Sequence, residues 1–546
     1  MLPRHAYCAD TLRVMQVFDQ IQNKTGFWNV SLMIKPEGRS LLLDKTNTIV
    51  VSDDIITLCF QGYSAEEGNN RLAFLLSHEI AHIMNNDLDY DRFLNPFQNS
   101  LSNELLEVRK QKELNADLRA VSIMSVSGYS TGQFSNEKKN IITDIYKLYR
   151  LKKSSVKKLY ADAAERVRMI NFRKQVLNEY NRLYECGNLM LMLSEENDND
   201  YFLDICIEAY NSYQNYTSIT TPELLNNMGL CYIHKARLYY SKDFMIDPDT
   251  LDFRNFEWGY VINSEVNTLR SASGILNNRP SLKTGISSTE MFDYRTSYKK
   301  AVNCFNQALL MSNNEYLPAR LNPVVLYGLN QQYEDARDLL ADIKSNNSRD
   351  LSRYHLLPFY YNLNALIEYC RGQKELAKDY LKEAVKGDPE FIAAERNMEL
   401  MGAGSSVTAD CRDDVIPRGT LLNYTMKMYD KIKPGTLKNY PFGLRDKYNL
   451  SYSENDSMKI MIVRSNNSLK SIELIGIKRG EIPGTLIRTG SNRQDILAHL
   501  SRDYTASFSQ HKKFYHFKKA GLILCFGENE LLDEIIILNK TGYFGE

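Results

Sequence analysis

From about residue 140 to residue 405, apolar residues recur with helical spacing almost without interruption. Within this stretch, a three-residue pattern occurs three times, at offsets of 35 and 41 residues. It has a small residue at position i, a large one at i+4 and, in two of the three copies, another small one at i+7. Small residues let neighbouring helices approach closely, so the pattern favours helix pairs stacked one on the next. The three copies are Ala301, Phe305 and Ala308; Ala336, Leu340 and Ile343; and Ala377, Leu381 and Ala384.

Helix pairs of about 34 residues with this spacing resemble tetratricopeptide repeats. Residues 226–236 and 321–336 look like the first helices of two such units. A generic helical bundle is the alternative interpretation. Residues 241–293 are rich in Asn, Ser and Asp and interrupt the pattern, so we interpret them as a long insertion.

Strand-like patterns lie on both sides of the helical stretch. The 546 residues are too many for one core, and three domains would be an ordinary partition. Before the helices, residues 29–34 and 47–52 combine β-branched residues with turn signals. After a Gly- and Ser-rich stretch at 401–414, a short helix is expected at 493–504. Further strands are expected at 458–464, 470–477, 512–517, 521–526 and 533–538.

These patterns predict a multidomain α+β protein. Its predicted parts are an N-terminal domain (1–180), a helical repeat region (181–402) with the insertion near 241–293, a linker (403–413) and a small α+β domain (414–546).

Composition excludes several classes of partner. Lys plus Arg equals Asp plus Glu, so no net field attracts nucleic acid or an anionic membrane. No apolar run approaches the roughly 18–20 residues of a transmembrane helix, so we predict no integral membrane segment. The first ten residues lack a signal peptide, although the tetrapeptide AYCA before Asp10 is compatible with the tail of one that begins upstream of Met1.

The segment FLLSHEIAHIMNND (74–87) contains His78, Glu79 and His82 in the pattern HExxH. On a helix, positions i and i+4 lie on one face, so the two histidines can present their imidazoles to one Zn²⁺ ion. Glu79 is rotated about 100° from His78, beside the metal, where a general base for a zinc-bound water belongs. Apolar neighbours make the rest of this helix a buried one, as a site in a cleft requires.

A zinc peptidase site needs a third protein ligand and an open fourth position. The candidates on the next helix are Glu104, Glu107 and Glu113. We favour Glu113, because Asp117 lies one turn later on the same face and can accept a hydrogen bond from a ligand histidine. The small residues Ala116 and Ala120 allow this helix to pack closely on the HExxH helix.

HExxH with a downstream ExxxD resembles the gluzincin metallopeptidases, and more closely the HtpX/BepA-type family, which also includes the CAAX prenyl proteases. The resemblance covers roughly residues 10–180 and includes NTIVVSDDIITLC, LLSHEIAHIMNND and ELNADLRAVSIMSVSGYS. It implies a zinc metallopeptidase domain with zinc at His78, His82 and Glu113. Glu79 would be the base, and Asp117 would support a ligand histidine.

The chain departs from this family in two ways. The gap from His82 to Glu113 is short and is closer to the family's minimal soluble members. The family's later His-Pro…Glu-Arg segment corresponds to YADAAERVRMI (160–170), with Tyr160 in place of the histidine and Arg166 retained. Tyr160 is a candidate donor to a tetrahedral oxyanion. Its alternative role is that of a core tyrosine.

We therefore predict a soluble zinc endopeptidase for protein or peptide substrates, with a role in protein quality control. An extended substrate would add to the edge of the sheet along the strand TNTIVVS. A protein partner or client would bind the helical repeats, and the C-terminal domain would be an accessory module. A metallopeptidase joined to repeats resembles the BepA arrangement and implies the periplasm or cell envelope. If Met1 is the true start, the cytoplasm is implied instead.

Two other interpretations stay open. The protein can act as a repeat-based scaffold or chaperone-like adaptor in which the zinc site is silent or autoinhibited. Alternatively, the zinc is purely structural and holds helices together, which would require a fourth protein ligand in the open position.

Overall fold

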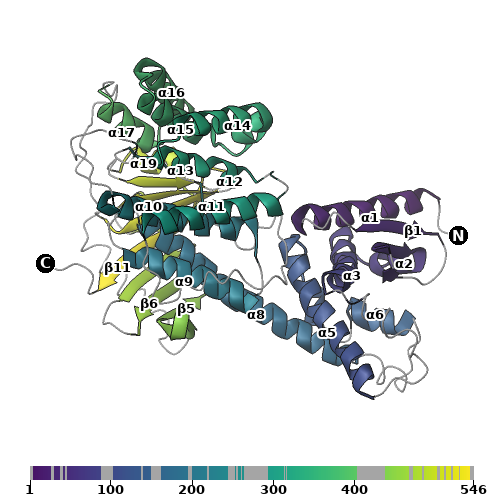
Figure 1. Cartoon of the computed structure of the whole chain (residues 1–546). Coiled ribbons are helices and arrows are strands. Elements are labelled where there is room, and N and C mark those ends of the chain that lie inside the picture. Colours follow the sequence, from purple (N-terminus) through teal and green to yellow (C-terminus); the bar gives the residue numbers. More distant parts are fainter. Residues whose placement is uncertain are drawn as a thin grey trace.

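The chain is a multidomain α+β protein, described from a computed structural model. Figure 1 shows an N-terminal group of helices and strands on one side and a helical array with a large sheet on the other, with helix α8 (Ala163–Ser194) running between them. The structure describes residues 4–25, 30–36, 41–43, 46–85, 87, 103–136, 139–148, 162–194, 200–217, 220–243, 253, 256–259, 261–262, 293–312, 314, 316–402, 437–466, 471–482, 485–500, 504–508, 512–517, 520–527 and 529–541.

The N-terminal group is a small sheet packed with helices. The sheet order is β1-β3-β2; β3 pairs in parallel with β1 and antiparallel with β2. Strands β1 and β3 confirm the strands expected at 29–34 and 47–52. The elements are α1 (Arg4–Thr25), β1 (Ser31–Lys35), β2 (Leu41–Leu43), β3 (Thr48–Ser52), α2 (Asp53–Phe60), α3 (Ala65–Met84), α5 (Asn103–Val126), η2 (Gly132–Ser135) and α6 (Ile141–Leu148).

The central position of β3 corrects one expectation. Residues 46–52 were expected to form the sheet edge on which a substrate lies, but β3 has β1 on one side and β2 on the other. Both of its hydrogen-bonding edges are therefore in use. Among the described residues, the outer edges of this sheet belong to β1 and β2, and β2 lies against α3.

The helical array consists of successive helices that pack on one another. The three sequence triplets lie on α11, α14 and α16, and all nine of their side chains are buried. Each of these helices packs against the helix that precedes it: α11 against α10, α14 against α13 and α16 against α15. The elements are α8, α9 (Asp200–Thr217), α10 (Pro222–Asp243), α11 (Tyr294–Met311), α12 (Leu317–Leu321), α13 (Pro323–Leu329), α14 (Tyr333–Arg353), α15 (Leu357–Cys370), α16 (Lys374–Gly387) and α17 (Ile392–Leu400).

Helix α8 is continuous through residue 180, where the sequence pattern placed the first domain boundary. Its first turns pack on α5 and α6, and its later part packs on α9 and α10. The predicted linker, residues 403–413, lies outside the described residues.

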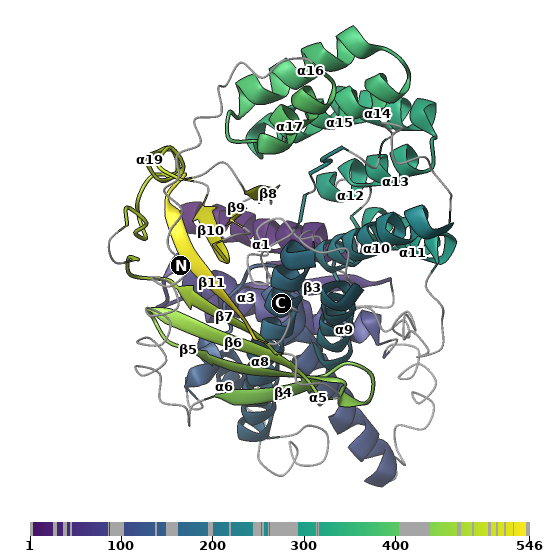
Figure 2. The ribbon, with the colours of Figure 1, turned by 90° about the vertical axis from the view of Figure 1, so that its left-hand side faces the viewer.

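An eight-stranded antiparallel sheet follows, in the order β4-β5-β6-β7-β11-β10-β9-β8. Figure 2 shows it beside α8 and α9. The expected strands are confirmed as β6, β7, β9, β10 and β11, whereas the helix expected at 493–504 ends at Leu497. The elements are β4 (Lys438–Phe442), η5 (Leu444–Asp446), β5 (Tyr448–Glu454), β6 (Met458–Ser465), β7 (Ser471–Ile477), α19 (Arg493–Leu497), β8 (Thr505–Phe508), β9 (Lys512–Phe517), β10 (Leu522–Gly527) and β11 (Leu532–Thr541).

The inner strands of this sheet are buried on both faces. On β6, Met461 and Val463 belong to the core shared with the helices, whereas Ile460 and Ile462 join a separate apolar cluster. Burial on both faces accounts for the continuous apolar runs by which the sequence revealed these strands.

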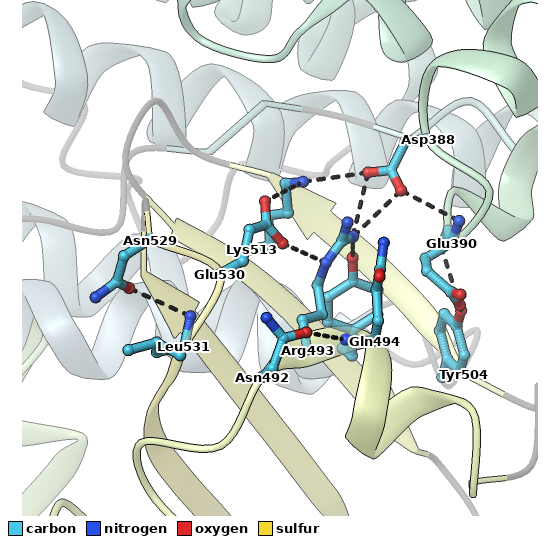
Figure 3. A network of polar contacts seen from close by, with 11 residues as sticks. Asp388, Glu390, Asn492, Arg493, Gln494, Tyr504, Lys513, Asn529, Glu530 and Leu531 are labelled. Carbon is cyan, nitrogen blue, oxygen red and sulfur yellow. Dashed lines mark hydrogen bonds and ion pairs between the residues drawn. The ribbon is translucent and has the colours of Figure 1, made fainter.

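Two buried ion clusters join the sheet to the helices. Lys459 on β6 pairs with Glu185 of α8 and lies 2.7 Å from Glu534 Oε1 on β11. At the other end of the sheet, Asp388 beyond α16 accepts hydrogen bonds from Arg493 at 3.2 Å and Lys513 at 3.3 Å, as Figure 3 shows. Glu530 pairs with both cations, so the cluster balances its charges.

We expect Lys459→Met to destabilise the protein by about 3–5 kcal/mol, because it leaves Glu185 and Glu534 without their shared cation. Urea unfolding followed by circular dichroism measures this change. Lys438→Met is the matched control, since Lys438 on β4 also bridges to α8, at Glu179, but is largely exposed. Equal unfolding midpoints for the two variants would contradict a role for the buried cluster.

Candidate metal centre

Helix α3 carries the HExxH residues and begins with a capping box. The Ser64 hydroxyl accepts a hydrogen bond from the Glu67 backbone N–H at 3.2 Å, and the Glu67 carboxylate accepts one from the Ser64 backbone N–H at 3.1 Å. An apolar face then buries the helix against its neighbours. Helix α5 packs on α3, with Ala116 and Ala120 completely buried. The local pattern therefore fixes where α3 starts and which face it buries.

Three potential metal ligands meet between α3 and α5. The Nε2 atoms of His78 and His82 lie 3.1 Å apart. Glu113 Oε2 lies 3.4 Å from His78 Nε2, and Glu113 Oε1 lies 3.6 Å from His82 Nε2. In a tetrahedral zinc site with bonds of about 2.0–2.1 Å, two ligand atoms lie about 3.3–3.4 Å apart. The observed separations are close to this spacing, with each histidine nearest to a different oxygen of Glu113, and imidazole and carboxylate are both ligands that zinc accepts.

Each histidine has a carboxylate at its other ring nitrogen. Asp117 Oδ1 lies 3.0 Å from His78 Nδ1, and Asp87 Oδ2 lies 2.8 Å from His82 Nδ1. Carboxylates in this position favour a proton on Nδ1, so that Nε2 is the nitrogen that would face a metal. Asp117 was expected from the sequence, whereas Asp87 was not. Its only signal was an acidic residue five positions after His82, in a segment without regular periodicity.

Arg166 on α8 holds Asp117 in place. Its Nε and one terminal nitrogen each donate to the carboxylate of Asp117 at 2.6 Å, and both side chains are buried. Its other terminal nitrogen lies 3.8 Å from Glu113. Burial opposes ionisation of Asp117, but Arg166 outweighs it and lowers the pKa of that carboxyl. The ion pair thus keeps Asp117 charged beneath His78.

The carboxylate of Glu113 is held in its ionised form. Burial acts against the charge, but the hydrogen bond and charge of His78 and the charge of Arg166 lower the pKa of Glu113 to about 2. Burial likewise opposes the charged form of His78, yet Asp117 and Glu113 raise the pKa of its imidazole to about 10. A carboxylate that stays ionised at neutral pH is the state that metal ligation requires.

Glu79 follows His78 on α3 and is half-buried. Burial raises the pKa of its carboxyl, while the nearby charges of His78 and His82 oppose the rise. A raised pKa suits a group that must accept and then release a proton near neutral pH.

Of the other candidate residues, Glu107 is largely exposed and lies 3.7 Å from Lys110. The side chain of Glu104 and the whole of Tyr160 lie outside the described residues. Within the part of the chain that the structure describes, no fourth His, Cys, Asp or Glu joins the three ligand candidates. Tyr146 on α6 is a neighbour that the sequence did not indicate; burial raises the pKa of its hydroxyl, and Arg166 opposes the rise.

No known family model matches the chain, and no curated protein matches it. None of the described helices is both long and apolar enough to cross a membrane.

We expect Asp87→Ala to weaken zinc binding by about 10–100-fold, because His82 loses the carboxylate that orients its ring. Asp87→Asn should have a smaller effect, since its amide oxygen can still accept the hydrogen bond. Titration against a chelating indicator measures the affinity. Glu107→Gln, which removes an exposed charge on α5, serves as the control. Wild-type affinity in Asp87→Ala would show that Asp87 does not support the site.

Proposed function

We propose that the chain is a zinc-dependent endopeptidase acting on protein substrates, with zinc bound by His78, His82 and Glu113. The observation that carries the proposal is the convergence of their donor atoms, 3.1–3.6 Å apart, with Glu79 beside them on α3. When bound, zinc supplies a Lewis acid for the scissile carbonyl and lowers the pKa of a water molecule.

Glu79 is the proposed general base. It takes a proton from the attacking water and passes it to the leaving amine. Its raised pKa makes the carboxylate a better proton acceptor than an exposed glutamate. Asp117 and Asp87 keep the two imidazoles in orientation, and Arg166 holds Asp117. The charge of Arg166 near Glu113 also restrains that ligand.

The proposed fold of the N-terminal group is gluzincin-like. The sequence of elements β3, α2, α3 and α5, with the HExxH pattern on α3 and ExxxD on α5, supports this assignment. An extended substrate would pair with the outer edge of β2, because β2 lies against the helix that carries Glu79. This replaces the expectation that the substrate lies along β3.

The helical array is the proposed client-selecting part, with tetratricopeptide-like repeats. Its support is the pairing of α10 with α11, α13 with α14 and α15 with α16, with the sequence triplets buried on the second helix of each pair. The sheet domain at the C-terminus would be an accessory module, fixed to the array by its buried ion clusters.

We expect Glu79→Gln to lower the cleavage of an unfolded protein, such as reduced casein, by at least about 100-fold, because the base is removed. Since Glu79 is not a ligand in this proposal, the variant should retain zinc in metal analysis of the purified protein. Glu107→Gln is the control and should cleave as the wild type does. Equal turnover by Glu79→Gln and wild type, or a wild type without zinc affinity, would overturn the proposal.

The alternative function is a scaffold or chaperone-like adaptor with a silent zinc site. It is favoured by one observation, namely that the described apolar residues between 253 and 262 of the chain itself are buried in the array. It predicts that wild type and Glu79→Gln suppress the aggregation of an unfolded client equally while neither cleaves it.

A further inference from the structure

Part of the expected insertion near 241–293 lies inside the helical array. We call residues 253–262 the internal segment, of which residues 253, 256–259, 261 and 262 are described. The described apolar side chains of this segment are almost fully buried among the helices, although long Asn-rich insertions usually stay on the surface. These side chains are Phe253, Phe256, Trp258, Val261 and Ile262.

Four buried asparagines contact the backbone of this segment. They form what we call the asparagine ladder, and successive parts of the array supply them. The ladder consists of Asn226 on α10, Asn322 between α12 and α13, Asn362 on α15 and Asn397 on α17. All four are completely buried, so each amide must find its hydrogen-bond partners within the protein.

Two positions of the internal segment are held by paired hydrogen bonds. At Glu257, the backbone N–H donates to Asn397 Oδ1 at 2.9 Å and the carbonyl accepts from Asn397 Nδ2 at 2.7 Å. At Val261, the backbone N–H donates to Asn322 Oδ1 at 3.1 Å, and the carbonyl accepts from Asn322 Nδ2 at 2.9 Å. A side-chain amide here imitates the peptide group of a neighbouring strand, so it binds backbone without reading side chains.

The other two asparagines bind between and beside these positions. Asn362 Nδ2 donates to the Trp258 carbonyl at 2.8 Å and the Glu257 carbonyl at 3.0 Å. Asn226 Nδ2 donates to the Val261 carbonyl at 3.0 Å. The asparagines also form hydrogen bonds with each other: Asn397 Nδ2 donates to Asn362 Oδ1 and Asn322 Nδ2 donates to Asn226 Oδ1, both at 2.9 Å. The ladder thus consists of two hydrogen-bonded pairs, both directed at a single main chain.

Unlike the main-chain hydrogen bonds, the contacts of the internal segment's side chains with the array depend on the residue type. A Cβ added to Gly328 would lie 2.3 Å from the Phe253 ring, so only glycine leaves room for that ring. Phe256 packs edge-on against Tyr369, and the Glu257 carboxylate accepts from Arg396 at 2.6 Å. Gly259 has a positive φ of 65° and faces Phe359 and Phe391.

We propose that the asparagine ladder is a binding groove for extended polypeptide and that the internal segment is its built-in ligand, which excludes client peptides until it is displaced. The clients would share its chemistry, with aromatic residues before and after a carboxylate and a glycine following. This inference extends the client-selecting role that we propose for the array. Its test measures binding and not cleavage, so its failure leaves the metal-centre proposal intact.

An ordinary core would not explain the ladder. Apolar helices pack without buried amides, and each amide that loses its partner costs about 1–3 kcal/mol. Four amides aimed at one main chain instead make a site that accepts many sequences. A ligand tethered in the same chain has an effective concentration in the millimolar range, so it competes strongly with free peptides.

The test uses a fluorescein-labelled synthetic peptide with the sequence of residues 251–264, LDFRNFEWGYVINS. In the full-length protein, the double variant Phe256→Ala, Trp258→Ala weakens the internal ligand. By fluorescence anisotropy, the variant should bind the peptide at least 10-fold more tightly than wild type, because the competing segment is weakened. A peptide with the same residues in scrambled order can still form the main-chain hydrogen bonds but loses the fit of its aromatic side chains, so it should bind the double variant at least 10-fold more weakly.

A second pair of variants tests the ladder itself. In the double-variant background, Asn362→Ala should weaken peptide binding at least 10-fold. Asn364→Ala should not, because Asn364 is also buried on α15 but donates to the Tyr360 carbonyl of its own helix. Equal losses in the two variants, or none in Asn362→Ala, would refute the role of the ladder.

Thermal melting decides the result where a variant is unstable. Peptide that binds the groove stabilises the folded state, so saturating peptide should raise the Tm of the double variant and leave wild type unchanged. A folded double variant that binds no more tightly than wild type would overturn the proposal. So would a destabilised one whose Tm the peptide does not raise, since the segment would then be only a structural part of the array.

Discussion

The ion pair between Arg166 and Asp117 is the contact on which the arrangement of the candidate metal centre depends. Two hydrogen bonds of 2.6 Å join side chains that are both buried, one on α8 and the other on α5. Buried charges are tolerated only when they are paired and hydrogen-bonded, so removing either side chain would leave the other as an unpaired buried charge. Since Asp117 also contacts His78, this pair ties the orientation of a candidate ligand to the position of α8.

Helix α8 carries the attachments of all three parts of the molecule. Arg166 reaches the metal centre, Glu185 pairs with Lys459 of the sheet, and Asn188 accepts a hydrogen bond from Asn227 of α10 at 2.8 Å. The first two attachments are 19 residues apart, about 28 Å along a helix. One helix therefore spans the distance between the candidate metal centre and the helical array and sheet.

Much of the candidate metal centre was predictable because its signals are local. HExxH and ExxxD place side chains on helix faces by spacing alone, so the sequence was enough to group His78, His82, Glu113 and Asp117. Asp87 was missed because it follows the end of α3, where no periodicity indicates where a side chain points. Its contact with His82 depends on the path of the chain beyond the helix.

The order of the strands was not predictable, because it depends on long-range pairing. The chain order β1, β2, β3 becomes the sheet order β1-β3-β2, and no local pattern encodes that exchange. Strands β4, β5 and β8 were missed because they are short or rich in polar residues, unlike the buried runs of β6 and β10.

The asparagine ladder is a further feature that local sequence patterns do not reveal, and it bears on function as well as on packing. An asparagine within a helical pattern normally indicates a solvent-facing position, because its amide needs partners that a helix does not provide. Here the partners come from a segment that is distant in sequence, as with Asn397 and Glu257. The cost of burying the amides is offset only while a main chain lies between them. A groove of this kind is stable when filled, which gives the chain a reason to carry its own ligand and makes displacement, not access, the step that controls client binding.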